Sequence, residues 1–375
     1  MHALMTPALT LAAQSLLITT PNPRVGCIIV SADGQVVGQG QTQRAGEPHA
    51  EIMALRDAMA QGQSTLGAIA YVTLEPCSHH GRTGPCCDAL IAAGIGKVVA
   101  AIADPNPLVS GQGFARLRAA GVEVELLSVD DPCAMASREL NIGFFSRMIR
   151  KSPWVRMKLA ASLDGKTALA NGASQWITAE AARADGHAWR ARACAILTGI
   201  GTVLHDCPRL DVRLVETPRQ PHLVIVDSKL ETPLDAPLFI AGRAVYIYAA
   251  ARNDEKMAAL QARGATIIYL PETDASGKPG AKVDLAAMLR DLGQREINEL
   301  HVEAGHKLNG SMVRAGLVDE FLVYLAPKLI GQGADMADFG PLADLASALA
   351  LEFKSTAMVG PDLRIVARVS GRDVF

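Results

Sequence analysis

Three side chains that can bind one metal ion place the strongest limit on how this sequence folds. His49 lies in the run Pro48-His49-Ala50-Glu51, Cys77 follows Pro76, and Cys86 comes after a further eight residues. Proline beside each of these positions is typical of turns. If one ion binds all three side chains, three separate turns must meet at one point, and this restricts the arrangement of every segment between them.

The residue types indicate a hydrolytic zinc site. Catalytic zinc uses three protein ligands of nitrogen, sulfur or oxygen, with water in the fourth position, and it lowers the pKa of that water to about 7. A His-x-Glu run followed by Pro-Cys and a second Cys is typical of zinc deaminases that act on nucleobases. We therefore predict His49, Cys77 and Cys86 as ligands of one zinc ion and Glu51 as the catalytic proton carrier.

The segment between the two cysteines departs from the usual deaminase pattern. The pattern has two intervening residues, whereas this sequence has eight, and the insert 78–85 is polar, basic and interrupted by Gly and Pro. We expect a loop at the mouth of the site. Two alternatives stay open: the cysteines are small buried core residues, or His79 or His80 completes a closed structural zinc site with four ligands.

Bulk composition limits the function classes. A length of 375 residues allows two domains, and a net charge of −2 with 4% aromatic residues argues against a nucleic-acid-binding surface. Seven cysteines, an odd number scattered along the chain, fit a reducing compartment. The apolar N-terminal run lacks the basic residues of a secretion signal, and other apolar stretches are too short to span a bilayer. We expect a cytoplasmic enzyme with small-molecule substrates and no nucleic-acid or membrane partner.

Hydrophobic periodicity predicts alternating strands and helices in the first part of the chain. This order is typical of a layered α/β domain with a largely parallel sheet. His49 and Cys86 fall near helix N-termini, where the partial positive charge favours thiolate. A hairpin turn at 32–34 is expected to join the first strand to Val36-Val37. The expected strands are 25–30, 68–74, 97–103 and 122–127, and the expected helices are 4–17, 49–59, 86–93, 113–120 and a long one at 131–148.

A charged break that ends in a proline, at 150–153, predicts the domain boundary, so we expect domains at 1–149 and 150–375. The second domain also alternates strands and helices, and we expect a second α/β fold. The expected strands are 154–161, 193–197, 222–226, 245–248, 266–270, 299–302, 320–325 and 363–369, and the expected helices are 179–191, 255–262 and 285–292.

Two glycine-containing turns in the second domain suggest an anionic ligand. The turns at 303–311 and 198–202 each follow an expected strand, where backbone N–H groups can meet a phosphate, although each can be a plain turn. Arg190 and Arg213 can grip a phosphate or form surface ion pairs, and Trp176 can be a core residue or a cofactor wall. No GxGxxG run follows a strand, so the residues alone leave the chemistry of this domain open.

Six longer runs resemble the bifunctional deaminase/reductase family of riboflavin biosynthesis, in order and over essentially the whole chain. The runs are TPNPRVG at 20–26, GEPHAE at 46–51, LEPCSHHGRT at 74–83, DPNP at 104–107, KLAASLDGK at 158–166 and SQWIT at 174–178. The resemblance implies a cytidine-deaminase-like three-layer domain followed by a dihydrofolate-reductase-like domain, both α/β.

The resemblance also implies two consecutive reactions. The first domain would hydrolyse the 2-amino group of 2,5-diamino-6-ribosylamino-4(3H)-pyrimidinone 5′-phosphate with one Zn²⁺ per chain. The second would use NADPH to reduce 5-amino-6-(5-phosphoribosylamino)uracil to the ribityl product. We expect a homo-oligomer, either a dimer or a tetramer.

Family positions carry over residue by residue. The zinc ligands and the proton carrier of the family fall on the four residues named above. The positions that contact NADP fall on Ala160, Trp176, Thr202, Asp206, Ser228, Gly305, His306, Lys307, Leu308, Asn309, Gly310 and Ser311. The positions that contact the substrate fall on Ser174, Arg190, Leu210, Arg213 and Glu303.

Three positions depart from the family pattern. Thr42 replaces a His found in many members, Gly84 replaces a common Pro, and Cys207 replaces an Asp. None belongs to the expected zinc ligands, but Thr42 stands where the His of other members faces the deaminase site. Two rival functions stay open on the residues: an RNA-editing deaminase with an RNA-binding second domain, and a structural zinc module joined to a nucleotide sensor.

Overall fold

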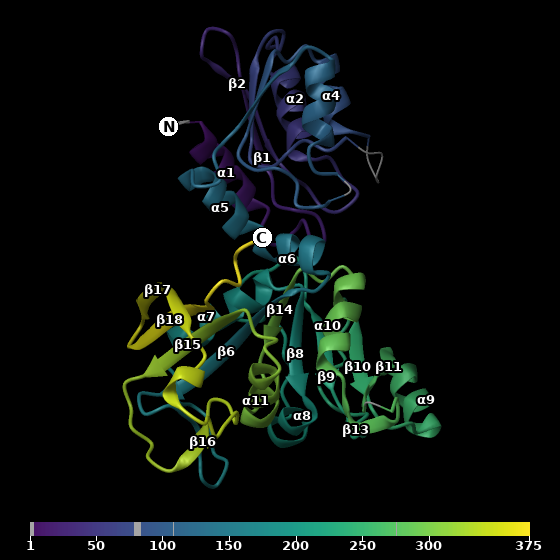
Figure 1. Ribbon diagram of the computed structural model, residues 1–375, viewed down its shortest axis with the longest axis vertical. Coiled ribbons are helices and arrows are strands. Elements are labelled where there is room, and N and C mark those ends of the chain that lie inside the picture. The colour runs from purple at the N-terminus through teal and green to yellow at the C-terminus, as the bar shows by residue number, and fades with distance from the viewer. Residues whose placement is uncertain (1–3, 79–83, 108, 275) are drawn as a thin grey trace. The chain divides into compact units, whose positions relative to one another are not determined.

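The chain divides into two compact units, Met1–Arg150 and Lys151–Phe375, and the expected boundary lies one residue from this division. The structure is a computed structural model, shown in Figure 1, and it describes residues 4–78, 84–107, 109–274 and 276–375. Each unit has its own sheet and its own hydrophobic core.

The first unit is built on a five-stranded mixed sheet in the order β2-β1-β3-β4-β5. Strands β3, β4 and β5 are parallel, but β1 pairs antiparallel with both β2 and β3. The predicted hairpin between β1 and β2 is confirmed, and its short turn permits only an antiparallel pair. The expectation of a largely parallel sheet is wrong for β1, which is antiparallel to β3 as well. The strands are β1 Gly26–Val30, β2 Val36–Gln41, β3 Ile69–Val72, β4 Lys97–Ala100 and β5 Glu123–Leu126.

Helices cover this sheet, and one of them lies unusually close to it. A Cβ atom on Gly38 would lie 2.2 Å from the carbonyl oxygen of Ala54, and one on Gly40 would lie 2.5 Å from the nitrogen of Ala54. Glycine at both places lets α2 approach the backbone of β2. The helices are α1 Met5–Gln14, α2 Ala50–Ala60, α3 Cys86–Ala92, α4 Gln112–Ala119, α5 Pro132–Leu140 and α6 Ile142–Arg150.

The long helix expected at 131–148 is two helices, because Asn141 interrupts it. Asn141 ends α5 with φ −110° and ψ 18°. Its side chain accepts a hydrogen bond from the backbone N–H of Arg24 at 2.7 Å and donates one to the Arg24 carbonyl at 2.9 Å. A contact with a residue more than one hundred positions away breaks the helix here, and local periodicity could not reveal it.

The second unit contains a nine-stranded sheet in the order β11-β10-β9-β8-β14-β6-β15-β18-β17. Every pair from β11 to β15 is parallel, and β18 and β17 complete the sheet in antiparallel pairs. The strands are β6 Trp154–Ser162, β8 Ala195–Gly199, β9 His222–Val226, β10 Val245–Ala249, β11 Ala265–Tyr269, β14 Glu299–Val302, β15 Glu320–Ala326, β17 Leu351–Val359 and β18 Asp362–Val369.

Helices pack on the nine-stranded sheet, and two small sheets flank it. The small sheets pair β7 Lys166–Leu169 with β16 Gly333–Asp335, and β12 Pro271–Thr273 with β13 Pro279–Val283. The sequence did not predict these four strands, α8 or β17. The helices are α7 Glu180–Arg192, α8 Ile200–Asp206, α9 Asp254–Ala262, α10 Leu285–Gln294 and α11 His306–Arg314, with a 3₁₀ turn at Leu345–Ser347.

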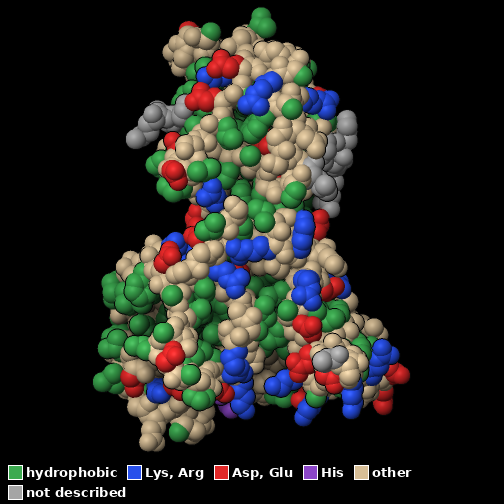
Figure 2. Space-filling model, in the orientation of Figure 1, with side chains coloured by type: hydrophobic (Ala, Val, Ile, Leu, Met, Phe, Trp, Pro, Cys, Tyr) green, Lys and Arg blue, Asp and Glu red, His purple; other side chains and the backbone are tan. Residues whose placement is uncertain are grey.

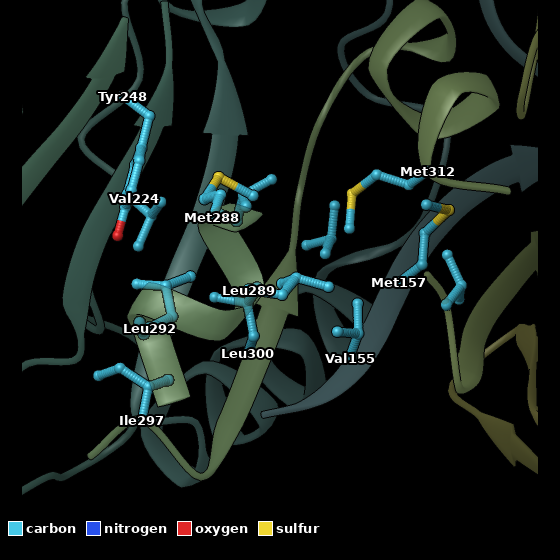
Figure 3. Close-up of a cluster of buried hydrophobic side chains, with 14 of the residues drawn as sticks. Val155, Met157, Val224, Tyr248, Met288, Leu289, Leu292, Ile297, Leu300 and Met312 are labelled. Carbon is cyan, nitrogen blue, oxygen red and sulfur yellow. The ribbon is translucent and has the colours of Figure 1, made fainter. Parts of the chain in front are cut away.

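Strand β6 shows how one strand serves both the core and the opposite face of the sheet. Val155 and Met157 join Leu300, Met288 and other apolar side chains in the core of Figure 3. Alternate side chains of a strand point to opposite faces. The side chains of Arg156, Lys158 and Ala160 therefore point away from this core. The opposite face is where charged and cavity-lining residues of β6 lie.

No helix among the described residues is both long enough and apolar enough to cross a membrane.

Candidate functional site

The three predicted zinc ligands lie together at the carboxyl end of β3. His49 is the N-cap residue of α2, and its side chain makes no capping hydrogen bond. Cys77 follows β3, and Cys86 is the first residue of α3. The Nδ1 atom of His49 lies 3.7 Å from Sγ of Cys77 and 3.4 Å from Sγ of Cys86, and the three donor atoms lie within 4.8 Å of one another.

These distances fit one tetrahedral zinc ion. Bond lengths of ~2.3 Å to sulfur and ~2.0 Å to nitrogen at tetrahedral angles place the nitrogen and each sulfur about 3.6 Å apart. Both observed separations are within a few tenths of an ångström of that value. The set is the single group of three potential ligands among the described residues. His79 and His80, the alternative source of a fourth ligand, lie outside those residues.

The environment of the cysteines favours a metal-binding thiolate at Cys77. Hydrogen bonds from the Cys86 thiol, from His49 and from the Cys86 backbone N–H lower the pKa of Cys77 to about 4, although burial opposes this shift. The Cys86 N–H lies 3.3 Å from that sulfur. The thiolate is the form of cysteine that binds metals, so these surroundings suit Cys77 as a zinc ligand.

Glu51 lies in the first turn of α2, two residues after His49, and its side chain is buried. Burial and repulsion from the Cys77 thiolate raise its pKa to about 7. A carboxyl group with a pKa near the working pH can both accept and release a proton. This placement suits the predicted role of Glu51.

Glu75 supports this site, a role that the sequence pattern did not predict. Its buried carboxylate accepts hydrogen bonds from the backbone N–H groups of Gly111, Gly113 and Phe114 at 3.0, 2.9 and 3.4 Å. The last two belong to the first turn of α4, which has no cap from its own N-cap residue. Glu75 therefore caps α4 from the segment that carries Cys77. Glu75 belongs to the run at 74–83 that resembles the family, and it lies two residues before Cys77. This position could have indicated a role at the zinc site.

Two of the departures from the family pattern have simple surroundings. Thr42 is buried, and its hydroxyl lies 3.5 Å from the carbonyl oxygen of Val25. Nothing lies within 4 Å of the position that a Cβ atom on Gly84 would occupy. Gly84 is therefore not required by packing.

The second unit holds a large cavity of about 2160 Å³ along the carboxyl ends of its parallel strands. Sixteen of the seventeen positions predicted to contact cofactor or substrate in this unit line it. They are Ala160, Ser174, Trp176, Arg190, Thr202, Asp206, Leu210, Arg213, Ser228, Glu303, Gly305, His306, Lys307, Leu308, Asn309 and Ser311.

Gly310 is the exception. It is buried on α11, and a Cβ atom there would lie 1.8 Å from the carbonyl oxygen of Asp338. Glycine is needed here because the backbone of another segment approaches closely, and the residue does not face the cavity. Its contact with the cofactor stays a prediction.

A charged cluster occupies one part of the cavity. The guanidinium of Arg190 makes two contacts with the carboxylate of Glu303, one of them 2.8 Å long, and Asp211 accepts from Arg213 at 2.7 Å. Burial opposes ionisation of Glu303, but Arg190 holds its pKa well below the usual range. Arg190 and Arg213 thus form ion pairs, as one alternative expected, and these pairs lie at the cavity.

Lys158 was missed as a site residue, although it opens one of the quoted runs. It lies on β6, lines the cavity, and interacts electrostatically with Glu303 and Arg190. Burial lowers its pKa, and Glu303 partly offsets the effect. Lys158 lies two residues before Ala160 on the same strand, so both side chains share one face. Because Ala160 was a predicted cofactor contact, this spacing could have indicated that Lys158 faces the same site.

Trp176 is a wall of the cavity and does not belong to the core. It is 61% exposed, and the guanidinium of Arg183 lies 4.5 Å from its ring centroid. The Lys328 ammonium donates to the carbonyl oxygens of Trp176 and Ile177 at 3.3 and 2.9 Å. These contacts hold an aromatic surface at the cavity.

The comparisons with known proteins agree for both units. Residues 1–102 match the cytidine and deoxycytidylate deaminase zinc-binding region, and residues 153–365 match the RibD C-terminal domain. The chain is 44% identical to the riboflavin biosynthesis protein RibD of Escherichia coli (strain K12), with 96% of each chain covered. The chain belongs to the RibD family.

Solved RibD structures share the whole fold. RibD of Acinetobacter baumannii, form 1, superposes with a TM-score of 0.86 at 38% identity, covering 98% of each chain. A Thermotoga maritima protein, named as a diaminohydroxyphosphoribosylaminopyrimidine deaminase/5-amino-6-(5-phosphoribosylamino)uracil reductase, superposes with a TM-score of 0.83 at 31% identity, covering 97% of each chain. The expected deaminase-like and dihydrofolate-reductase-like folds are confirmed.

RibD membership decides between the interpretations that the residues left open. The chain is a bifunctional enzyme of riboflavin biosynthesis with a zinc-dependent deaminase domain and an NADPH-dependent reductase domain. It acts on small molecules. The RNA-editing deaminase and the structural zinc module are not supported.

Proposed function

We propose that the two domains catalyse consecutive steps on one nucleotide. The first unit removes the 2-amino group of 2,5-diamino-6-ribosylamino-4(3H)-pyrimidinone 5′-phosphate as ammonia. The second reduces the ribosyl group of the resulting 5-amino-6-(5-phosphoribosylamino)uracil to ribityl with NADPH. The name of the Thermotoga maritima relative supports these substrates. The observation that carries the proposal is the meeting of His49, Cys77 and Cys86 beside the buried carboxyl group of Glu51.

In the deaminase, His49, Cys77 and Cys86 would hold zinc, and Glu51 would move protons. Bound zinc would supply a water molecule acidic enough to ionise near neutral pH. Glu51 accepts a proton from the attacking water as oxygen bonds to the ring carbon that bears the amino group. It then returns the proton to the nitrogen, and the C–N bond breaks to release ammonia. The buried position of Glu51 excludes bulk water from this transfer.

In the reductase, NADPH would supply a hydride to C1′ of the ribosyl group. The proposed cofactor contacts are those predicted from the family. Helix α11 begins at this cavity after Gly305, which makes no side-chain cap, so its first N–H groups can bind the cofactor pyrophosphate. A cavity of about 2160 Å³ has room for a dinucleotide and a nucleotide together.

Substrate contacts in the reductase would come from Ser174, Arg190, Leu210, Arg213 and Glu303. Arg213 would bind the 5′-phosphate, for which a guanidinium is well suited. Opening of the ribose ring breaks the C1′–O4′ bond, and O4′ then needs a proton. Lys158 faces the cavity from the neighbouring strand β6, and burial lowers the pKa of its ammonium, so it can donate that proton.

A coupled assay tests both steps. The diaminopyrimidine nucleotide is supplied with NADPH, and ammonia release and NADPH absorbance are followed together. We expect ammonia to appear first and NADPH oxidation to follow, and we expect no NADPH oxidation before deamination. Ammonia release without any NADPH oxidation would contradict the proposed reductase substrate, and the reverse result would contradict the order of the steps.

We also infer a homo-oligomer, dimer or tetramer, that functions in the cytoplasm. Edge strand β17 exposes Leu351, Phe353 and Met358 by 43, 73 and 65%, and Figure 2 shows hydrophobic side chains gathered where this strand lies. Exposed apolar surface of this kind is typical of protein–protein contacts. None of the seven cysteines forms a disulfide, in keeping with a reducing compartment. Light scattering on the full chain tests the oligomer, and a monomer would contradict it.

A further inference from the structure

The cavity of the second unit runs across several strands, so an elongated ligand can lie along it. Lys158 on β6, Glu303 after β14, Gly199 at the end of β8 and Val226 at the end of β9 all line it. These four strands are consecutive neighbours in the sheet. Three steps of ~4.8 Å separate β6 from β9, about 14 Å in all. A dinucleotide with its nicotinamide near β6 would place its adenosine near β9.

The end of the cavity at β9 is built by two segments that contact each other. Ser228 follows β9, and its hydroxyl accepts a hydrogen bond from the backbone N–H of Val283, on β13, at 3.3 Å. The backbone N–H groups of Ala250 and Ala251 donate to the carbonyl of Ser228 at 3.0 and 2.8 Å. These hydrogen bonds hold the backbone at Ser228 and Val283, next to Lys229 and Lys282, in a fixed position.

Two lysines flank this contact. Lys229 follows Ser228, Lys282 precedes Val283, and both line the cavity. Within the described part of the chain neither ammonium has an ion-pair partner within 4.0 Å, unlike Lys97, Lys166 and Lys354. Two unpaired cations at one end of an anion-binding cavity favour a further negatively charged group there.

Three acidic residues among those that the structure describes line the same end of the cavity, and none of them forms an ion pair with Lys229 or Lys282 within 4.0 Å. The Asp284 carboxylate caps α10 through the backbone N–H of Ala287 at 2.8 Å. The side chain of Glu272 packs over Gly280, where a Cβ atom would lie 2.9 Å from its Cγ. Glu231 is the remaining acidic residue that lines this end of the cavity.

We propose that Lys229 and Lys282 bind the 2′-phosphate of the adenosine ribose and so select NADPH over NADH. This inference rests on the proposed use of NADPH in this cavity. The two cofactors differ only in that phosphate, which carries close to two negative charges at neutral pH and accepts several hydrogen bonds. An ammonium binds phosphate as a point charge and needs no fixed orientation. Neither lysine belongs to the contacts expected from the family.

Equilibrium binding to the full-length protein tests the proposal without depending on turnover. Isothermal titration calorimetry compares adenosine 2′,5′-bisphosphate with adenosine 5′-monophosphate, and NADPH with NADH. The variants are Lys229→Ala, Lys282→Ala and the double variant. Lys278→Ala is the matched control, because Lys278 is an exposed lysine between β12 and β13 that does not line the cavity.

We expect the wild-type protein to bind each 2′-phosphorylated probe more tightly than its partner. Loss of both charged contacts should raise the Kd for NADPH and for the bisphosphate about 10- to 100-fold. The Kd values for NADH and the monophosphate should change less than about twofold, which also shows that the double variant is folded. Lys278→Ala should match the wild type.

Two results would overturn the proposal: a double variant that keeps the wild-type preference for 2′-phosphorylated probes, or a wild-type protein without that preference. Failure of the proposed function has a different signature. In that case the protein would not oxidise NADPH with the ribosyl substrate, whatever its binding preference. The two failures are therefore separable.

Discussion

The two sites of this enzyme are built on different scales. The deaminase site gathers three ligands and one carboxyl group from short segments around a single strand end, with donor atoms within 4.8 Å of one another. The reductase cavity draws on five parallel strands and the loops between them. A compact site depends on each residue and is easily recognised in sequence. A broad site distributes its binding energy, and single residues are harder to recognise.

The largest effect is expected at the compact site. Glu51→Gln should lower the rate of ammonia release by about 10²- to 10⁴-fold, because the amide cannot carry the proton. Zinc content, measured by atomic absorption, should stay at the wild-type level, since Glu51 is not a ligand. NADPH oxidation with the deaminated substrate should be unchanged and serves as the internal control. Near-normal ammonia release would remove Glu51 from its role.

At the broad site a single substitution should cost less. Arg213→Ala should raise the KM of the reductase for its phosphorylated substrate about 10- to 100-fold, the usual effect of losing a charged hydrogen bond. The matched control is Arg252→Ala, because Arg252 stacks on Tyr269 and does not line the cavity. Steady-state kinetics at saturating NADPH provide the measurement, and an unchanged KM would contradict the assignment of Arg213.

A glycine substitution separates packing from ligand contact within the broad site. Gly310→Ala should destabilise the second unit by about 1–3 kcal/mol, because the new methyl group must displace the backbone of Asp338. Gly84→Ala in the first unit meets open space and should change stability by less than about 0.5 kcal/mol. Urea unfolding of both variants measures the difference. Wild-type stability in Gly310→Ala would show that the close approach is not required.

The smallest expected effect is a pH dependence of the second unit. Burial, Arg190 and Arg213 lower the pKa of His187 to about 4 in the folded protein, against about 6.5 for an unperturbed imidazole. Between these values the unfolded chain binds a proton that the folded protein does not, so the free energy of unfolding falls as the pH falls from 7 toward 4.

His187→Gln isolates this contribution, because glutamine does not titrate. The variant should lose less stability than the wild type between pH 7 and pH 5. Tryptophan fluorescence during urea unfolding reports this unit alone, because Trp154, Trp176 and Trp189 all lie in it. Parallel pH profiles for the two proteins would show that His187 does not titrate in this way.

Local pattern predicted a large part of the structure. Apolar runs bounded by turn residues located most strands of both sheets, since a buried strand needs apolar side chains over its whole length. The zinc ligands could be predicted from the sequence, because their residue types are rare in this order and each ligand lies beside a proline. The cavity residues came from resemblance to a family, because a Gly-containing turn or an arginine has many uses.

Other features arise only from contacts between distant segments. Arg24 breaks the long helix at Asn141, and the backbone of Asp338 explains Gly310. Strand β17 escaped prediction because an edge strand with exposed side chains lacks the alternation of a half-buried one.

The sequence by itself determined the order of the elements, the metal-binding residue types and the family. Each of these depends on residue identity and local spacing. Only the tertiary structure decided that β1 also pairs antiparallel with β3, that Lys158 reaches the cavity beside Glu303, and that Lys229 and Lys282 both line its far end. Those outcomes depend on which segments pack side by side, and that follows from burial of apolar surface across the whole unit.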